Sequence, residues 1–318
     1  MYHLATAIPV IRRLRIPISR DQAFMLMAAF NELMLAVEIY LAHSISATIV
    51  FNEWIPIIFG PIAAFLLGLA GLISLRNRPL AIWIAVPTLI SSIGIGLLGA
   101  FFHLHRALQP FAGTGLRVNV PLVIWAPPLL APLTFVLVGL IGLSAIWRES
   151  PADSGALALT DSYRLQLPYS KTRGYFFLVS LGMLATLISS VLDHARTDFS
   201  NPWLWIPTAA GLLGTVVPLL IGFIEKPRRA DIWFYICTML AIILVGIMGI
   251  VLHILTDLGS EHEIVLERLI RGAPLLAPML FADIATLGLL ALMDPNETVK
   301  KAAQGQNFGS LPEQAPGS

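Results

Sequence analysis

The amino-acid sequence predicts an all-α, polytopic membrane protein in which eight transmembrane helices form two tandem four-helix bundles. Three observations lead to this fold class: a low content of charged residues, eight long apolar stretches, and an ordered internal repeat. Of the 318 residues, 57% are hydrophobic and only 12% are charged, with a mean hydropathy of +0.80. A soluble domain carries about a quarter charged residues, so a soluble protein with buried helices is the poorer interpretation.

Eight apolar stretches are each long enough to cross a bilayer, which takes roughly 20 apolar residues in a helix. Polar or glycine- and proline-containing segments such as Arg76-Asn77-Arg78 separate them. Each stretch is therefore expected to be one transmembrane helix. The stretches lie near residues 23–43, 54–75, 80–103, 121–147, 174–194, 203–224, 232–254 and 271–293.

The polar segments divide the chain into five parts. Residues 1–22 carry four arginines among apolar residues and are expected to lie as an amphipathic segment on the anionic cytoplasmic surface of the membrane. The other parts are a first transmembrane repeat (23–147), a cytoplasmic linker (148–173), a second transmembrane repeat (174–293) and a tail (294–318) that we expect to be disordered.

Lysine and arginine residues set the expected orientation in the membrane. Fifteen of the 20 lie in the terminal segments and in the loops at 76–79, 148–173 and 225–230. The positive-inside rule then places both termini in the cytoplasm, and we expect a bacterial-type inner (plasma) membrane. The single cysteine, Cys237, excludes an internal disulfide and covalent attachment of a c-type haem. No basic patch indicates a nucleic-acid partner.

The second half of the chain repeats the first half in order. His43 is followed thirteen residues later by Pro56, as His194 is by Pro207. The offsets between matching residues are 151, 150 and 146 along the chain, and such ordered matches indicate a tandem duplication. Each unit has four spans, so the repeat is parallel. Further matches are Gly96, Gly99 and His103 with Gly246, Gly249 and His253, and Pro-Leu-Leu-Ala-Pro at 128–132 with the same sequence at 274–278.

The duplication includes four of the seven histidines: His43 with His194, and His103 with His253. They lie near the ends of the first and third helices of each unit, which both run outward, so all four are expected near the outer surface. In an up-down bundle the first and third helices are diagonal neighbours across the core. Two imidazoles facing each other there are arranged like the axial ligands of one b-type haem. We therefore expect two haems b, one per unit.

Glycines and arginines support the haem hypothesis. Gly96 and Gly99 precede His103 by seven and four residues, and Gly246 and Gly249 precede His253 in the same way, which places them on the face of the histidine. A flat macrocycle beside a helix needs a face without side chains. Arg106 and Arg196, each close to one of these histidines, are candidates to bind the haem propionates.

Other interpretations of these residues stay open. Glycine in a membrane helix often marks close helix packing without a cofactor. Imidazole also binds copper and zinc, so the same four histidines could form a metal site. The acids near them, Asp193, Asp198 and Asp257, are not duplicated, which favours one histidine pair per bundle over a symmetric cluster. His105 and His262 have no counterpart in the repeat and are expected at the surface.

Four polar residues inside predicted spans have no counterpart in the other unit: Asn31, Glu32, Glu38 and Asp283. Ionisable residues in a membrane are candidates for function. Glu38 lies about a turn inward of His43 and could relay protons or form a hydrogen bond with a quinone. The alternative is a neutral acid bonded to a neighbouring helix. Asp283 is expected to be structural.

With these features the chain resembles the duplicated, eight-helix, histidine-paired membrane haem proteins, of which haem A synthase has the best-known architecture. That family also has two four-helix halves, each with one histidine pair about sixty residues apart, as His43/His103 and His194/His253 are here. Its pairs lie on even-numbered helices, whereas these lie on odd ones, and its acidic first outer loop is absent. The resemblance therefore implies the arrangement, one haem per bundle, and not the enzymatic activity.

The sequence thus predicts a cytochrome b-like membrane subunit rather than an independent enzyme. It would pass electrons between a periplasmic or membrane redox partner and the quinone pool. One alternative is a haem-free quinone-binding or anchoring subunit of a membrane complex. In helix count the chain is similar to the quinol-oxidising membrane subunits of molybdoenzymes related to polysulfide reductase, which bind quinone without haem, but it shares no motif with them. Another is a periplasm-facing protein that binds copper or zinc through the four histidines.

Overall fold

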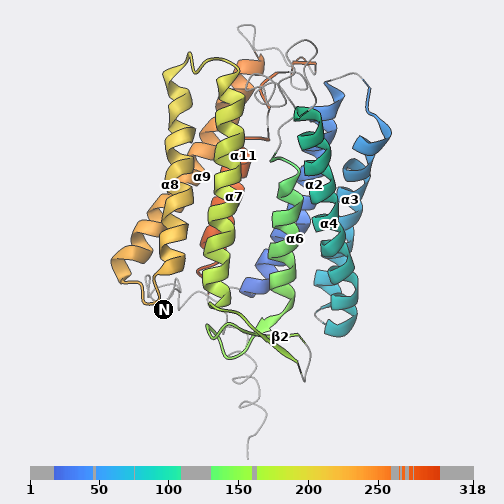
Figure 1. Ribbon diagram of the computed structural model, residues 1–318, viewed down its shortest axis with the longest axis vertical. Coiled ribbons are helices and arrows are strands. Elements are labelled where there is room, and N and C mark those ends of the chain that lie inside the picture. The colour runs from blue at the N-terminus through green and yellow to red at the C-terminus, as the bar shows by residue number, and fades with distance from the viewer. Residues whose placement is uncertain are drawn as a thin grey trace, which may run out of the picture.

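The computed structural model describes residues 18–45, 48–74, 76–108, 130–159, 163–258, 265, 267–268, 272–274 and 276–293. Helices that run alternately up and down dominate these residues (Figure 1). The first half contains α2 (Arg20–Ser44), α3 (Phe51–Ile73), α4 (Arg78–Ala107) and α6 (Leu133–Ile146). The second half contains α7 (Lys171–Ala195), the 3-10 turn η2 (Pro202–Leu204), α8 (Trp205–Phe223), α9 (Arg229–Leu258) and α11 (Met279–Leu290).

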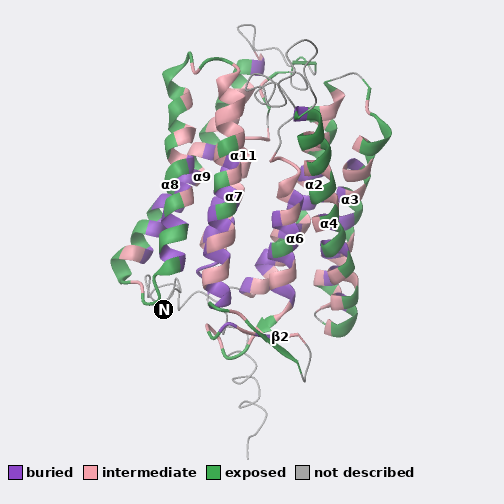
Figure 2. Ribbon diagram, viewed as in Figure 1, coloured by how far each residue is buried: buried purple, intermediate pink, exposed green. Residues whose placement is uncertain are grey.

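Within the described residues, six segments are long and apolar enough to cross a membrane: α2, α3, α4, α7, α8 with η2, and α9. Large apolar side chains are exposed on them; Phe51, Phe65 and Trp83, for example, keep 82%, 70% and 78% of their surface. Figure 2 shows exposed residues along the outward faces of α4 and α8, whereas buried residues gather toward the middle of the bundle. Large exposed apolar patches mark interaction surfaces, and a bilayer covers a surface of this kind. The chain is therefore a helical membrane protein, as its composition predicts.

The two remaining helices, α6 and α11, are shorter than the predicted spans 121–147 and 271–293. They have 14 and 12 residues, or about 21 and 18 Å of helix, against a hydrocarbon core of about 30 Å. Both begin directly after a proline, Pro132 or Pro278. Each proline therefore stands at the start of a helix, whereas the predicted spans place it inside one. The predicted beginning of the earlier span, 121–129, lies outside the described residues.

Each half closes into a ring of four helices. In the first half α2 contacts α3 and α6, and α4 contacts the same two helices, so α2 and α4 stand on opposite corners. In the second half α7 and α9 stand on opposite corners in the same way, between α8 and α11. The halves meet where α6 contacts α7 and where α2 contacts α11. These two contacts are equivalent if α2 corresponds to α7 and α6 to α11.

The linker between the halves folds into a small antiparallel sheet of β1 (Arg148–Glu149), β2 (Ala156–Ala158) and β3 (Arg164–Gln166). It lies at the end of the bundle where α2 and α7 begin, which we call the sheet end; we call the opposite end the histidine end (Figure 1). Buried polar contacts tie the sheet end together. Lys171 Nζ lies 2.8 Å from Asp21 Oδ1, and Arg20 Nη1 donates to Thr172 Oγ1 at 2.8 Å. The helix starts of the two halves are thereby joined.

Candidate functional site

The four duplicated histidines lie together at the histidine end. His43 and His194 are the next-to-last residues of α2 and α7, and His103 and His253 lie in the last two turns of α4 and α9. All four side chains are half-buried. Because α2, α4, α7 and α9 all run from the sheet end to the histidine end, their last turns meet at a similar depth.

The structure brings His43 and His103 together. Their ring centroids lie 6.2 Å apart with an angle of 53° between the ring planes, although α2 and α4 stand on opposite corners of the bundle. Two imidazoles that bind one metal from opposite sides, with metal–nitrogen distances of about 2.0 Å, place their centroids roughly 6 Å apart. The spacing therefore suits two ligands of a single metal.

Hydrogen bonds of the histidines leave one ring nitrogen suited to bind a metal. His43 Nδ1 lies 2.9 Å from the Ile39 carbonyl oxygen, and His253 Nδ1 lies 2.8 Å from that of Pro274. A carbonyl oxygen only accepts, so Nδ1 carries the proton in each ring and the neutral ring keeps its lone pair on Nε2. Metal-binding histidines are commonly oriented by such a second hydrogen bond.

The surroundings of the histidine pairs differ between the halves. His43 Nε2 lies 3.8 Å from Glu53 Oε1 at the start of α3. In the second half, His194 Nδ1 lies 3.5 Å from Ser190 Oγ, and the His194 ring contacts Phe199 at a centroid distance of 6.1 Å. His194 and His253 are close enough to interact electrostatically. The halves therefore differ at this end, where the described ring contacts are His43 with His103 in the first half and His194 with Phe199 in the second.

The candidate propionate ligands are placed differently from each other. Arg106 is exposed in the last turn of α4. Arg196 follows α7 directly, and its Nη2 lies 3.5 Å from Asp193 Oδ1, so this arginine already has an anionic partner. His105 is exposed, as expected, and its ring contacts Phe101. His262 lies outside the described residues.

The glycines of the predicted haem face have a different neighbour in the structure. A methyl group on Gly96 would lie 2.8 Å from the carbonyl oxygen of Pro132, and one on Gly99 would lie 2.8 Å from Pro132 Cβ. Gly246 and Gly249 meet Pro278 in the same way, at 2.9 Å and 2.7 Å. Both pairs of glycines therefore allow the start of α6 or α11 to pack closely against α4 or α9. The helix faces at these glycines are thus occupied by protein and are not open for a macrocycle, in contrast to the haem hypothesis.

The histidine and glycine contacts show how well these residues fit a haem. The imidazole pair of the first half fits axial ligation, but the helix faces at Gly99 and Gly249 do not fit a flat macrocycle, because Pro132 and Pro278 occupy them. A single metal ion needs no such space. Among the described residues there is no group of three or more histidine, cysteine, aspartate or glutamate side chains arranged to hold a metal. A metal would depend on the two imidazoles, with the remaining ligands from outside the described cluster.

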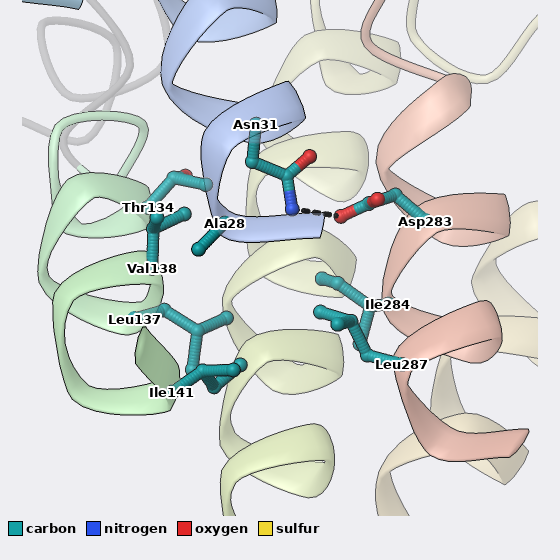
Figure 3. A pocket seen from close by; sticks show the side chains of 9 residues that line it. All are labelled: Ala28, Asn31, Thr134, Leu137, Val138, Ile141, Asp283, Ile284 and Leu287. Carbon is teal, nitrogen blue, oxygen red and sulfur yellow. Dashed lines mark hydrogen bonds between the residues drawn. The ribbon is translucent and has the colours of Figure 1, made fainter. Parts of the chain in front are cut away.

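Asn31 and Asp283, two polar residues inside the helices, are joined by a hydrogen bond in the structure. Asn31 Nδ2 donates to Asp283 Oδ2 at 3.0 Å, linking α2 of one half to α11 of the other (Figure 3). Glu38, the predicted proton or quinone residue, lies two turns further along α2 and is half-buried. The only signal for this pair in the sequence was that both residues are polar and lie inside predicted spans.

The chain was compared with known proteins, and no protein-family model, curated protein or solved structure matches it.

Proposed function

We propose that this chain is an integral membrane subunit that carries a transition-metal centre on the histidine pair of each half and uses it in electron transfer. The centre would stand between a redox partner at the histidine end and the quinone pool of the membrane. The observation that carries the proposal is the contact between His43 and His103, two half-buried imidazoles from opposite corners of one bundle at 6.2 Å.

Haem b and a bare metal ion differ in what they require of these residues. Both would use Nε2 of the paired histidines, which the hydrogen bonds of Nδ1 to backbone carbonyls favour for His43 and His253. A bis-histidine haem supplies one-electron redox chemistry when bound. It would also require Pro132 and Pro278 to move away from the glycines, whereas a copper ion would leave this packing unchanged.

The membrane arrangement belongs to the same proposal. Eight spans as a parallel tandem duplication account for the two rings of four helices and for the equivalent glycine–proline contacts in each. The sheet end carries Arg78, Arg148, Lys171 and Arg173, so the positive-inside rule places it in the cytoplasm of a bacterial-type inner membrane. The histidine end then faces the periplasm, where a soluble redox partner would reach it.

The experiment is to purify the full chain in detergent, record the dithionite-reduced minus oxidised absorption spectrum, and measure bound iron, copper and zinc. We expect a metal in the wild type, reduced in amount by His103→Ala or by His253→Ala, because each variant removes one ligand of one pair. His105→Ala is the matched control, since His105 lies two residues from His103 but is exposed. A b-type α-band would identify haem, and copper without this band would identify a bare redox-active ion. Zinc alone, which has no redox chemistry, would contradict electron transfer and indicate a zinc-binding protein instead.

A second candidate function is a haem-free anchoring or quinone-binding subunit of a larger complex. The packing of Pro132 and Pro278 on the glycines favours it, because close helix packing alone accounts for the duplicated glycines. A wild-type preparation that contains neither haem nor stoichiometric metal would contradict the electron-transfer proposal and support this one.

A further inference from the structure

The interface between the halves carries a polar stripe on one side. On α2 the stripe is lined by the polar residues Asn31 and Glu38, with Met34 and Leu35 between them. On the opposite side it is lined by Asp283, Met279 and Leu280 of α11 and by Leu276 just before that helix. Both sets follow the spacing of one helical face. The stripe begins near the middle of α2, at Asn31, and ends at Glu38, about 10 Å closer to the histidine end.

Asp283 has one carboxylate oxygen bound and one without a described partner. Oδ2 accepts the hydrogen bond of Asn31 Nδ2, at 3.0 Å. Oδ1 is buried, and none of the described residues offers it a hydrogen bond. An unsatisfied carboxylate oxygen in the middle of a membrane protein is unfavourable, because no water replaces the missing hydrogen bond. Asp283 Oδ1 can therefore be satisfied by binding a proton or by accepting a hydrogen bond from a donor outside the described residues.

The same molecule contains an apolar version of this contact. Asn31 corresponds to Gly182 by the offset of 151 residues, and Asp283 corresponds to Leu137 by the offset of 146. Gly182 lies directly against Leu137 where α7 meets α6, since a methyl group on Gly182 would lie 2.6 Å from Leu137 Cδ2. Helix packing at this contact thus needs no polar group. Of the two contacts between the halves, only the one between α2 and α11 carries a described polar pair, Asn31 and Asp283, and helix packing alone does not explain it.

Two small hollows adjoin Asp283, and both are lined by Asn31, Thr134 and Asp283; Figure 3 shows the inner one. The inner hollow continues toward the sheet end between apolar residues such as Leu137 and Ile141. The outer hollow continues toward the histidine end as far as Glu38. Each has room for a group about the size of a water molecule, and the outer hollow offers the several polar partners that a water needs. A quinone ring is too large for either.

Glu38 connects the outer hollow to the histidine end. Glu38 lines that hollow on α2, five residues before His43, and the charge of Asp193 on α7 acts on it. Asp193 in turn pairs with Arg196 just beyond the end of α7. Among the described residues, the charged and titratable groups around this route are Asp283, Glu38, Asp193, Arg196 and His253.

From this arrangement we propose that Asp283 is a proton-binding site inside the membrane, and that Glu38 with water in the outer hollow carries protons between it and the histidine end. One O–H bond forms at Asp283 Oδ1 when a proton arrives, and the proton is released to Glu38 when it leaves; no electron is transferred. Asn31 is a positioning residue that holds Asp283 through Oδ2. The proposal does not depend on a metal at the histidines.

The test is infrared difference spectroscopy of the full chain in lipid vesicles, titrated between about pH 4 and pH 9 and transferred from H2O to D2O. We expect a carboxylic C=O band that appears as Asp283 takes up a proton, is absent in Asp283→Asn, and shifts promptly in D2O. Glu38→Gln should leave this band in place and slow its exchange by about tenfold or more, because the relay is removed.

The matched control is Glu32→Gln. Glu32 is fully buried within the first half and lies 2.6 Å from Ser92 Oγ, away from the hollows. Its replacement should not change the exchange of the Asp283 band. Exchange at the wild-type rate in Glu38→Gln would overturn the relay, and a band that follows Na+ concentration rather than pH would overturn proton binding in favour of a cation. If Asp283→Asn does not fold, the exchange rate in Glu38→Gln still decides the proposal.

Discussion

Pro132, directly before α6, lies so close to Gly99 of α4 that a methyl group on Gly99 would be 2.8 Å from Pro132 Cβ. Real Cβ atoms do not approach one another at this distance, and the proline ring has no flexible end that could move aside. One turn deeper, Gly96 meets the backbone at Pro132 and Val136. Gly96 and Gly99 are therefore determined by helix packing, and substitution at these positions tests this conclusion.

We expect Gly96→Ala to destabilise the protein by about 1–3 kcal/mol, because overpacking against backbone atoms forces the helices apart. Gly94→Ala is the control on the same helix: nothing lies within 4 Å of an added Cβ there, so its effect should be small or slightly stabilising. The measurement is reversible unfolding in mixed detergent micelles. Equal stability of the two variants, with loss of a cofactor only in Gly96→Ala, would restore the interpretation of Gly96 as clearance for a macrocycle.

A second prediction concerns the Asn31–Asp283 hydrogen bond. Asp283→Leu alone should lower the free energy of unfolding by about 1–3 kcal/mol, because it leaves the amide of Asn31, a residue that is only 8% exposed, without its acceptor. The double variant Asn31→Ala with Asp283→Leu should recover most of this loss, since it approaches the apolar contact of Gly182 with Leu137. A double variant as unstable as Asp283→Leu would show that the two residues are not coupled.

A third prediction concerns the sheet end. Thr172 is fully buried, accepts a hydrogen bond from Arg20 Nη1 at 2.8 Å and donates one to Asp153 Oδ1 at 3.0 Å. Thr172→Val keeps the shape and removes both bonds, so we expect a loss of about 1–3 kcal/mol. Thr186→Val is the matched control, because the Thr186 hydroxyl bonds only to Gly182 O in its own helix, and its loss should be a few tenths of a kcal/mol, roughly. Similar losses in both variants would contradict a specific role for Thr172.

Much of the fold could be predicted from the sequence because a bilayer imposes a simple rule on it. Apolar runs of about 20 residues become helices, and six of the eight predicted spans contain a helix long enough to cross. The meeting of His43 with His103 was also predictable, since an up-down bundle places the first and third helices on opposite corners and both histidines near the same end. These inferences depend only on helix direction and spacing.

What the sequence did not reveal depends on which atoms meet across helices. The spacing of Gly96 and Gly99 shows a face without side chains, but not that Pro132 fills it. The starts of α6 and α11 were misjudged because a proline inside an apolar run can either kink a helix or begin one, and the run itself does not decide. The Asn31–Asp283 bond joins residues 252 positions apart, and neither has a repeat partner that would mark it.

A last prediction concerns orientation. The sheet end holds Arg78, Arg148 and Arg173, so we expect it to face the cytoplasm. In a Cys237→Ala background, Ser154→Cys at the sheet end and Ser200→Cys at the histidine end each give one exposed thiol. A membrane-impermeant maleimide added to intact bacteria should label Ser200→Cys, and should label Ser154→Cys only after the membrane is permeabilised. Because the proposed redox partner and the proton route both meet the protein at the histidine end, the opposite labelling pattern would move both to the cytoplasmic side.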